Sequence, residues 1–445
     1  MQRRRIAVVG GGVAGTGAAW LLARQHDVTL FEGRGRLGGH TNTVICHLPE
    51  GEVPVDTGFI VYNEPNYPQL TALFSHLGVA TQESDMSFAF AATDLDLEYS
   101  GSGLAGLFAQ RRNLLRPRFW RMVRDILRFN GEAGRRLTVG LPEDLALGEL
   151  LDELGLGAAF RRYYLLPMSA AIWSCPQDVM LRFPAQSFLR FFHNHGLIRL
   201  RDRPQWRTVS GGGREYLTRL QAGIQTVVTG TPVRQVVRAD GGDGVRLYGD
   251  AGELGRFDEV VIGAHADEAL AMLEQPSFWE RTVLGAFGYQ HNDAWLHTDR
   301  RLMPRRRSVW SSWNHLTRQA ADGTRPVSVT YWMNRLQNLP TATDVLVTLN
   351  PLDPPAADTV IRREGYAHPV FDREAMRAQR LLPVIQGRDR IWYCGSYHGY
   401  GFHEDAFASA VQVAEQLGAP APWHGVAAPA PAAAATPTVG APAVS

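Results

Sequence analysis

Three glycines and one glutamate near the start of the chain have the types and spacing of a dinucleotide site. In the pattern formed by Gly10, Gly12 and Gly15, the first glycine allows a tight turn, the second admits a pyrophosphate, and the third lets a helix pack closely on a strand. Glu32 follows at the distance where a carboxylate accepts a hydrogen bond from a ribose hydroxyl. These residues predict binding of a dinucleotide, chiefly by backbone N–H groups.

Such a site requires a strand before the glycines, a helix after them and a second strand before the glutamate. The apolar run Ile6–Val9, the small-residue pattern Thr16–Arg24 and the apolar run Val28–Phe31 meet these requirements. Free N–H groups and the positive end of the dipole at the helix start both favour a phosphate. We therefore expect a Rossmann-like βαβ unit at the beginning of the chain.

The segment after Glu32 indicates which dinucleotide is bound. Residues 32–41 read Glu-Gly-Arg-Gly-Arg-Leu-Gly-Gly-His-Thr, and this segment resembles the E-x-R-x-R-x-G-G-R-T motif of the flavin amine oxidase and phytoene desaturase superfamily. The resemblance implies that the cofactor is FAD rather than NAD(P), with Glu32 at the adenosine ribose and Arg34 near the pyrophosphate. His40 stands where the motif has arginine, and a histidine is not a fixed charge at pH 7.

Two further segments resemble motifs of the same superfamily. The Asp56-Thr57-Gly58 segment resembles the stretch that runs beside the flavin ring, and residues 390–406 resemble the closing motif before the last helix. In that motif Ser396 replaces the usual acid or threonine. The residues that the resemblance assigns to FAD are Gly10, Gly12, Val13, Ala14, Gly15, Glu32, Gly33, Arg34, Arg36, Gly38, Gly39, His40, Thr41, Gly58, Phe59, Ile60, Val233 (through its backbone, at the adenine), Gly395, Ser396, Phe402, His403, Glu404 and Ala406.

The resemblance also implies the fold, which is an α/β fold with a Rossmann-like, GR2-type FAD-binding domain and an interleaved α+β substrate domain of the amine-oxidase type. A chain of 445 residues is long enough for two joined domains. We expect residues 1–79, 206–266 and 385–420 to form the FAD-binding domain, and residues 80–205 (largely helical) and 267–384 (an antiparallel sheet) to form the substrate domain. The Ala/Pro-rich residues 421–445 are expected to be a disordered tail.

Alternating apolar and polar residues predict strands in the substrate domain. The predicted strands are Ser87–Tyr99, Asp293–His297, Val309–Trp313, Val327–Met333 and Asp344–Leu349.

The composition excludes several function classes. A formal net charge of +1 does not predict a nucleic-acid partner. The sequence contains no lysine, so a Schiff base, a lysine base and a water held by lysine are excluded. Cys46, Cys175 and Cys394 are too scattered for a disulfide framework or a zinc site. No cysteine lies in residues 364–393, where enzymes of the superfamily with covalent flavin carry one, so non-covalent FAD is expected.

The apolar runs are shorter than the roughly 20 residues needed to span a bilayer. The chain enters its first strand directly, without the apolar core of a signal peptide. We therefore expect a cytoplasmic protein, with peripheral contact at the inner membrane face as an open alternative.

The candidates for a catalytic base lie in or near aromatic segments. Residues 163–195 are aromatic and apolar, which predicts either a wall for an apolar substrate or an ordinary core. No metal is expected at the histidines of this stretch, because no carboxylate or third histidine stands nearby. The candidate bases are His193, His195, Tyr62, His398 and His403.

A basic amphipathic helix is predicted at residues 119–129. Arg121, Arg124 and Arg128 share one face, and large apolar residues form the other. Such a helix either lies at a lipid interface or packs as an ordinary core helix with a solvated face. The basic run at 300–307 is most simply a solvated hairpin loop, and the alternative is a second surface for anionic headgroups.

The expected reaction follows from what the chain lacks. Without lysine, and with Phe402 where amine oxidases of the superfamily carry a tyrosine, the chain is more similar to the desaturases. It also looks like a bacterial subgroup commonly encoded beside cyclopropane-fatty-acyl synthase-like methyltransferases, which implies a modified fatty acyl substrate. We expect an FAD-dependent desaturase or dehydrogenase that moves hydride from an apolar, lipid-like substrate to flavin N5. The alternatives are an amine oxidase, a non-redox flavin-dependent isomerase and a binding module with a structural cofactor.

Overall fold

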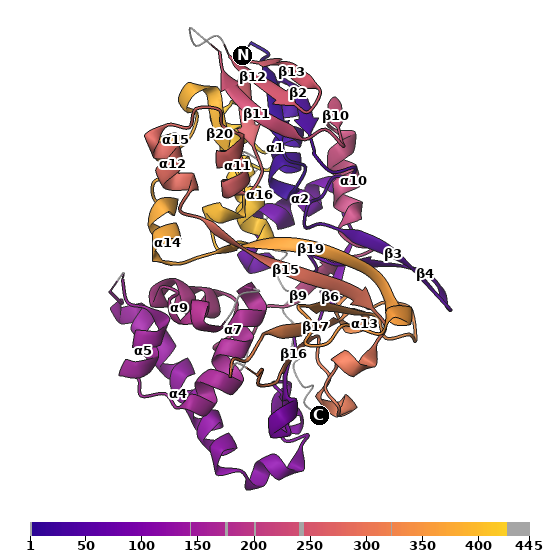
Figure 1. Ribbon diagram of the computed structural model, residues 1–445, viewed down its shortest axis with the longest axis vertical. Helices are drawn as coiled ribbons and strands as arrows, with labels where there is room; N and C mark the ends of the chain where they lie inside the picture. Colours follow the sequence, from indigo (N-terminus) through magenta and orange to yellow (C-terminus); the bar gives the residue numbers. More distant parts are fainter. Residues whose placement is uncertain are drawn as a thin grey trace, which may run out of the picture.

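The computed structural model describes residues 2–142, 144–173, 177–199, 202–239, 244–321 and 323–424. Cys175 and the Ala/Pro-rich residues after 424 lie outside these ranges. The described chain has a parallel-sheet part in the upper half of Figure 1 and a mixed-sheet part below it. Strands β15 and β19 cross the middle of the molecule between them.

The parallel-sheet part is built on the predicted βαβ unit. The strand order is β10-β2-β1-β14-β20, and each neighbouring pair is parallel. Helix α1 (Val13–Ala23) connects β1 to β2 and is buried along its whole length, which is why its sequence is small and apolar on every face. The strands are β1 (Arg5–Val9), β2 (Asp27–Phe31), β10 (Thr226–Val228), β14 (Glu259–Ile262) and β20 (Ile391–Tyr393).

Both faces of this sheet are covered, because successive side chains of a strand point to opposite faces. Ile6 and Val8 of β1 join a core with helices from one side, and Ala7 and Val9 join a second core on the other. The first face carries α1, α2 (Pro68–Leu77), α10 (Arg214–Ala222) and α16 (His403–Gln416). The second carries the small antiparallel sheet of β11 (Val233–Arg238), β12 (Val245–Gly249) and β13 (Gly252–Phe257).

Four helices expected in the substrate domain share the core on this second face instead. Ala269, Val283, Ala375 and Leu382 all pack in the cluster that contains Ile262 of β14. The parallel-sheet part therefore takes in the beginning and the end of the range 267–384. The four helices are α11 (Ala266–Met272), α12 (Phe278–Leu284), α14 (Arg373–Gln379) and α15 (Leu382–Ile385).

The mixed-sheet part contains a seven-stranded sheet in the order β19-β15-β18-β17-β16-β7-β8. Every neighbouring pair is antiparallel except β16 and β7, which are parallel. The strands are β7 (Phe88–Ala92), β8 (Leu97–Ser100), β15 (Gly288–His297), β16 (Trp313–Thr317), β17 (Ser328–Trp332), β18 (Leu346–Leu349) and β19 (Val360–Val370), and α13 (Met333–Leu336) follows β17.

Helices below and beside this sheet form a separate apolar cluster (Figure 1). Helix α4 (Pro117–Val139) begins with proline at its first turn, where the missing N–H costs nothing, and ends before Gly140. The other helices of this part are α3 (Gly103–Leu107), α5 (Leu147–Glu153), α6 (Ala158–Phe160), α7 (Leu166–Trp173), α8 (Gln177–Leu181) and α9 (Ala185–Asn194).

Two small sheets join the parts. One is the hairpin of β3 (Thr43–Leu48) and β4 (Gly51–Asp56), and the other has the order β5-β9-β6. The strands of the second are β5 (Tyr62–Asn63), β6 (Thr81–Ser84) and β9 (Trp206–Val209).

The structure corrects two local predictions and shows one strand that was not predicted. Ser87–Tyr99 is not one strand but the hairpin β7-β8, whose turn contains Asp96 at a φ of +43°. Val309–Trp313 is not a strand, because residues 307–309 form a helical turn and β16 begins only at Trp313. Strand β19, the longest in the sheet, was not predicted, since its many charged residues interrupt the apolar alternation.

Residues 419–424 pack on the parallel-sheet part. Ala419 and Ala421 are buried against the core of the parallel-sheet part. Trp423 stacks on Trp20 of α1 with ring centroids 6.4 Å apart, and its Nε1 donates to the side-chain oxygen of Gln69 at 2.8 Å. The expected disorder is therefore wrong for residues 421–424, and the rest of the predicted tail lies outside the described residues. Over the ranges that the structure describes, no helix combines the length and apolar character needed to cross a membrane.

Candidate cofactor site

The glycine loop between β1 and α1 has the conformation that a dinucleotide site needs. Gly10 has a φ of +102°, in the left-handed region that favours glycine. A Cβ on Gly15 would lie 1.8 Å from the carbonyl oxygen of Gly10, so only glycine lets α1 approach the loop. A Cβ on Gly12 would meet nothing within 4 Å. The loop is therefore closed on the Gly15 side and open at Gly12.

Helix α1 begins without a side chain that binds its first N–H groups. Gly12 is the N-cap residue, and the first turn contains no acidic residue. Val13 and Ala14, which follow, are buried and apolar. Because the first N–H groups of a helix have no partner within it, this end of α1 is suited to an anion such as a pyrophosphate.

The carboxylate of Glu32 holds the loop in place. It accepts hydrogen bonds from the N–H of Gly11 at 2.6 Å and from the N–H of Arg34 at 2.7 Å. The backbone oxygen of Glu32 accepts from Thr231 at 3.0 Å, two residues before Val233. The structure thus brings the residues predicted at the ribose and the adenine to one edge of the sheet.

The segment Gly38–Thr41 returns to the glycine loop. The N–H of Gly38 donates to the oxygen of Gly11 at 2.7 Å. A Cβ on Gly39 would lie 3.2 Å from the Cα of Gly12, so the two backbones are in close contact. The guanidinium of Arg36 donates to the oxygen of Gly39 at 3.3 Å and so supports this second loop.

The Asp56-Thr57-Gly58 segment packs against the second loop. A Cβ on Gly58 would lie 2.1 Å from the oxygen of His40, and the N–H of Phe59 donates to the same oxygen at 2.9 Å. The buried carboxylate of Asp56 accepts from Thr43 at 2.5 Å and from the N–H of Gly213 at 3.0 Å. Burial raises the pKa of Asp56 to about 6 despite these hydrogen bonds. Asp56 is therefore a positioning residue for this segment. The remaining predicted residue here, Ile60, packs in the core of the mixed-sheet part.

His403, at the start of α16, contacts three other segments. Its ring stacks on Phe59 with centroids 3.8 Å apart and planes 7° apart. Its Nε2 lies 2.8 Å from the hydroxyl of Thr41 and 3.0 Å from that of Tyr216. Burial lowers the pKa of His403 to about 3, so the ring is neutral at pH 7. His403 therefore joins the segments that contain Phe59, Thr41 and Tyr216. Tyr216 was not predicted as a site residue from the sequence.

The two acids of α16 also have partners within the protein. The carboxylate of Glu404 accepts from the N–H groups of Gln69 at 2.8 Å and Leu70 at 3.0 Å, at the start of α2. The carboxylate of Asp405 accepts from the N–H groups of Tyr400 at 2.8 Å and Phe402 at 2.9 Å. Burial raises the pKa of Glu404 to about 7 and that of Asp405 to about 6. The side chain of Glu404 is thus bound to α2, and only its backbone remains available to a cofactor. Ala406 is buried, and its N–H donates to the oxygen of Phe402 at 3.1 Å.

His40 lies in a cluster that the sequence did not predict. Its ring centroid is 5.2 Å from that of His368, 6.0 Å from that of His265 and 5.0 Å from that of Tyr366. Burial and the neighbouring histidines together lower the pKa of His40 well below its ordinary value, and burial lowers that of His368 to about 4. Across the described residues, no three histidine, cysteine or acidic side chains are placed to hold a metal ion.

Several buried polar atoms around these loops lack a partner. They are Nε2 of His40, Nε2 of His398 and the hydroxyl of Tyr397. Gly395 and Ser396 directly precede Tyr397, between β20 and α16. Burial lowers the pKa of His398 to about 4, so its ring is neutral at pH 7. Buried polar atoms normally have partners, so these atoms indicate that a polar group binds here.

An aromatic wall lies beside the start of α16. Phe402 stacks on Phe191 with centroids 4.9 Å apart, and Phe191 lies 4.7 Å from Trp173 and 3.9 Å from His195. Phe183, Phe188 and Phe192 extend the same cluster. The aromatic stretch predicted from the sequence therefore reaches the closing motif, and only residues 174–176 of it lie outside the described ranges.

The candidate bases lie in different parts of the structure. His195 ends α9 at this wall, and its Nδ1 lies 3.0 Å from the oxygen of Phe191. Burial lowers the pKa of His195 to about 4. His193 lies two residues earlier, in the last turn of α9, and residues at i and i+2 do not face each other on a helix. Tyr62 is buried between Tyr67 and Phe74 in the core of the parallel-sheet part.

The residues present fit FAD. The uncapped start of α1 and the open side of Gly12 suit a pyrophosphate, and Glu32 with the β11 edge suits an adenosine. The unpartnered atoms of His40, His398 and Tyr397 suit a large polar group.

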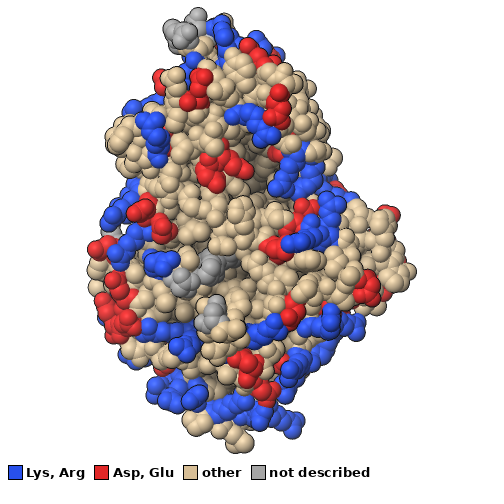
Figure 2. All heavy atoms as spheres, viewed as in Figure 1, with Lys and Arg blue, Asp and Glu red and all other residues tan. Residues whose placement is uncertain are grey.

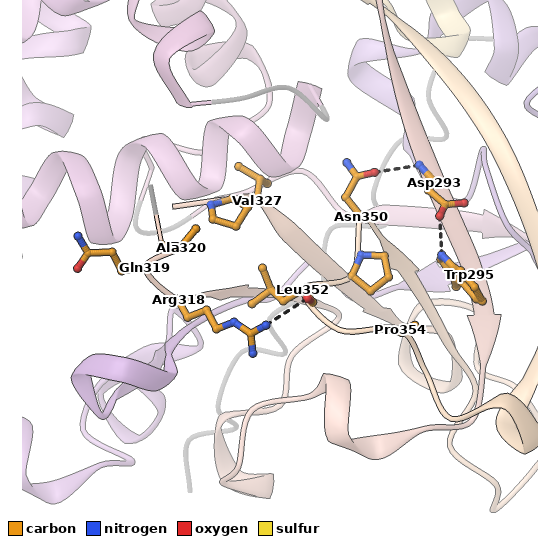
Figure 3. A pocket seen from close by; sticks show the side chains of 12 residues that line it. Asp293, Trp295, Arg318, Gln319, Ala320, Val327, Asn350, Leu352 and Pro354 are labelled. Carbon is orange, nitrogen blue, oxygen red and sulfur yellow. Dashed lines mark hydrogen bonds between the residues drawn. The ribbon is translucent and has the colours of Figure 1, made fainter. Parts of the chain in front are cut away.

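A separate hollow of about 690 Å³ opens on the mixed sheet (Figure 3). Its two charged lining residues, Asp293 and Arg318, are already bonded within the protein. Nε1 of Trp295 donates to Asp293 at 2.8 Å, and Arg318 pairs with Asp353 at 2.7 Å. No residue predicted for cofactor or catalysis lines this hollow.

The chain is similar to known flavin-containing proteins. A family model described as "Flavin containing amine oxidoreductase" matches residues 13–418. Among curated proteins, "Putative flavin-containing monoamine oxidase AofH" of Mycobacterium tuberculosis (strain H37Rv) is 28% identical over 265 residues, which are 56% of this chain and 54% of that protein. The chain thus spans about half the length of this curated relative.

Solved structures share the fold at low identity. A CLA-producing fatty acid isomerase from P. acnes has a TM-score of 0.66 at 16% identity, covering 93% of this chain and 98% of its own. Putrescine oxidase bound to putrescine has a TM-score of 0.65 at 14% identity, covering 94% and 99%. Cyclohexylamine oxidase from Brevibacterium oxydans has a TM-score of 0.60 at 15% identity, covering 94% and 100%. At these identities the likeness shows the fold alone.

Proposed function

The chain belongs to the flavin-containing amine oxidoreductase family, and on that premise we propose that it is an FAD-dependent oxidoreductase acting on an apolar, acyl-like substrate. Membership confirms the superfamily, the fold class and the FAD cofactor that the sequence predicted. The choice of an apolar substrate is our own inference.

One observation carries this choice, namely the aromatic wall at the start of α16. Phe402 stacks on Phe191, and Trp173 lies behind them, so the side chains next to the closing motif are apolar. With no lysine in the sequence, no ammonium group can hold a water there. An aromatic surface without a charged group favours a hydrocarbon chain over a hydrated cation.

The protein's own residues perform three tasks in this proposal. The first N–H groups of α1 would hold the pyrophosphate of FAD, and the start of α16 would direct its dipole towards negative charge on the cofactor. When bound, FAD supplies a two-electron acceptor. His195 would accept the proton that the substrate carbon loses. A carbonyl oxygen can only accept a hydrogen bond, so Nδ1 donates to the oxygen of Phe191 and Nε2 keeps a free lone pair for the proton.

The test is anaerobic mixing of the yellow protein with a bacterial phospholipid extract, with free fatty acids and with a panel of amines. We expect the absorbance of oxidised flavin to fade with a lipid and to persist with amines. His195→Gln should slow this fading by about 100-fold without changing the bound flavin. His291→Gln, at an exposed position of β15, is the matched control and should leave the rate unchanged. Fading that persists at full rate in His195→Gln would remove this residue from the mechanism.

Amine oxidation is the second candidate, favoured by the family and by the description of the curated relative. If amines bleach the flavin and lipids do not, the apolar-substrate proposal is wrong. A lipid product of unchanged mass, with the flavin returned to its oxidised form, would instead identify an isomerase.

A further inference from the structure

An exposed apolar surface lies at the end of the molecule opposite the parallel sheet, where α4 begins. Leu104 is 76% exposed, Leu115 is 85% exposed and Trp120 is 46% exposed. These are large fractions for side chains that normally lie inside a protein. We call Leu104, Phe108, Leu114, Leu115 and Trp120 the apolar tip.

The tip is continuous and held in shape from within. The ring of Trp120 lies 5.2 Å from that of Phe108, and its Nε1 donates to the oxygen of Leu114 at 2.9 Å. Phe108 in turn closes the turn that starts at Leu104, because its N–H donates to the Leu104 oxygen at 3.0 Å. On the inner side Phe119 and Met122 are buried and anchor α4 to the sheet. The tip is therefore a formed surface rather than a frayed end.

Arginines without carboxylate partners surround the tip. Within the described part of the chain, Arg111, Arg118 and Arg121 take part in no ion pair or side-chain hydrogen bond, and all three are exposed. Figure 2 shows the basic side chains, all of them arginines, gathered at the lower end of the molecule, where Figure 1 places α4. Unpaired guanidinium groups beside exposed leucines are complementary to a surface that is both anionic and apolar.

The basic run 300–307 differs from the arginines around the tip, because most of its arginines form ion pairs. Four arginines of the run 300–307 are ion-paired: Arg300 and Arg307 with Asp344 at 2.7 Å each, Arg301 with Asp299 at 2.6 Å, and Arg306 with Glu98 at 3.1 Å. Three carboxylates thus face these four guanidinium groups, so this run offers less free positive charge to a headgroup than the arginines around the tip.

A hollow of about 460 Å³ borders the tip. It is lined on one side by Phe108 and Arg111, and on the other by Ser308 and Trp310. The hydroxyls and the unpaired guanidinium on its rim are groups that bind a phosphate. The surface thus offers apolar side chains to the interior of a lipid layer and polar groups to its headgroups.

We infer that the apolar tip and its unpaired arginines dock the protein on an anionic phospholipid bilayer. The leucines and Trp120 enter the boundary between headgroups and acyl chains, while Arg111, Arg118 and Arg121 contact phosphates. This inference rests on exposed side chains and their charges, and does not depend on the proposed reaction.

The test is co-sedimentation of the holoprotein with vesicles of phosphatidylglycerol and phosphatidylcholine, or of phosphatidylcholine alone. We expect binding to the anionic vesicles that weakens as salt is added. Leu104→Ser with Leu115→Ser, and separately Arg118→Gln with Arg121→Gln, should each weaken binding at least about tenfold. All four positions are exposed, so the fold and the bound flavin should be unchanged.

Matched controls lie on the parallel-sheet part. Phe278→Ser replaces an apolar residue that is 67% exposed, and Arg377→Gln with Arg388→Gln removes two exposed arginines. Neither should change vesicle binding. Equal loss in the controls, equal binding to uncharged vesicles, or no binding to either kind of vesicle would overturn the inference.

Light scattering tests one alternative, in which the tip is a contact between two copies of the chain. If the wild type is a dimer that Leu104→Ser with Leu115→Ser converts to a monomer, the tip is a contact between copies of the chain and the bilayer inference is wrong. Vesicle binding is measured without turnover, so it can fail while the flavin still bleaches with lipid, and the reverse also holds.

Discussion

Two helices of the parallel-sheet part, α1 and α16, begin near the same loops but in opposite ways. Helix α1 starts at Gly12 with no side-chain cap and no acid in its first turn. Helix α16 starts at Phe402, and its first turn contains Glu404 and Asp405, both bound to backbone N–H groups of the protein. The two helices pack together so closely that a Cβ on Gly17 would lie 2.7 Å from the ring of Phe407.

The difference indicates a division of roles. An uncapped helix start is incomplete without an anion, so α1 is shaped by what binds there. The start of α16 also has no side-chain cap, but the acids of its first turn fix it to α2 and to the preceding turn. We infer that α1 supplies binding energy for the cofactor and that α16 supplies the rigid position of the closing motif.

The largest expected effect on stability comes from adding a side chain to the glycine loop between β1 and α1. Gly15→Ala would place a methyl 1.8 Å from the Gly10 oxygen, and we expect a loss of more than about 3 kcal/mol in the free energy of unfolding. Gly12→Ala meets nothing within 4 Å, so it should cost at most about 1 kcal/mol. It should nevertheless lower flavin affinity at least tenfold, since the methyl stands where the pyrophosphate approaches. Urea unfolding and flavin absorbance measure both quantities. Full flavin content in Gly12→Ala would contradict the role given to α1.

A smaller effect is expected at α16. Glu404→Gln replaces one accepting oxygen by a donor that faces a backbone N–H, and we expect a loss of about 1–3 kcal/mol in unfolding free energy. Bound flavin at saturating FAD should be unchanged. Glu374→Gln, at an exposed position in the first turn of α14, is the control and should have little effect on either quantity. Lost flavin with unchanged stability would instead place the Glu404 side chain at the cofactor.

The pH dependence of stability distinguishes the two neighbours at the start of α16. Glu404 has a pKa raised to about 7, so the stability it contributes is full below its ordinary value of 4.5 and is lost as the pH rises through 7. The cost of Glu404→Gln should therefore shrink between pH 5 and pH 8.

His403 has a pKa lowered to about 3, so its contribution is present above 6.5 and is lost as the pH falls below that value. His403→Gln should make the fall in stability between pH 6.5 and pH 4 less steep. The free energy of unfolding of the wild type and both variants, measured at several pH values, checks these opposite pH dependences. If the curves of the wild type and a variant are parallel, the replaced group does not titrate as described.

The smallest effect is expected where the end of the described chain supports α1. Trp423→Ala removes the stack on Trp20 and the hydrogen bond to Gln69, and should cost about 1 kcal/mol because the ring is partly exposed. Trp279→Ala, at a ring that is 39% exposed on α12, is the matched control. An equal loss of stability in both would show that Trp423 has no particular role at α1.

The glycine loop was predictable because its constraints are local in the sequence. The turn at Gly10, the close approach at Gly15 and the carboxylate of Glu32 each follow from residue type and spacing within one βαβ unit. The closing motif was less predictable, although its residues were identified. Its acid Glu404 binds Gln69 and Leu70, more than 300 positions away in the numbering, and no local pattern encodes such a pairing.

By itself the sequence determined the family, the parallel sheet, the FAD cofactor and the apolar character of residues 163–195. These depend on backbone conformation and on short-range periodicity, which the order of residues expresses directly. Only the tertiary structure decided that His403 joins Thr41 and Tyr216, that His40 lies among His265 and His368, and that Arg118 is unpaired while Arg307 is not. The physical reason is that burial and charge pairing depend on which distant segments meet, and identical residue types take opposite roles according to those neighbours.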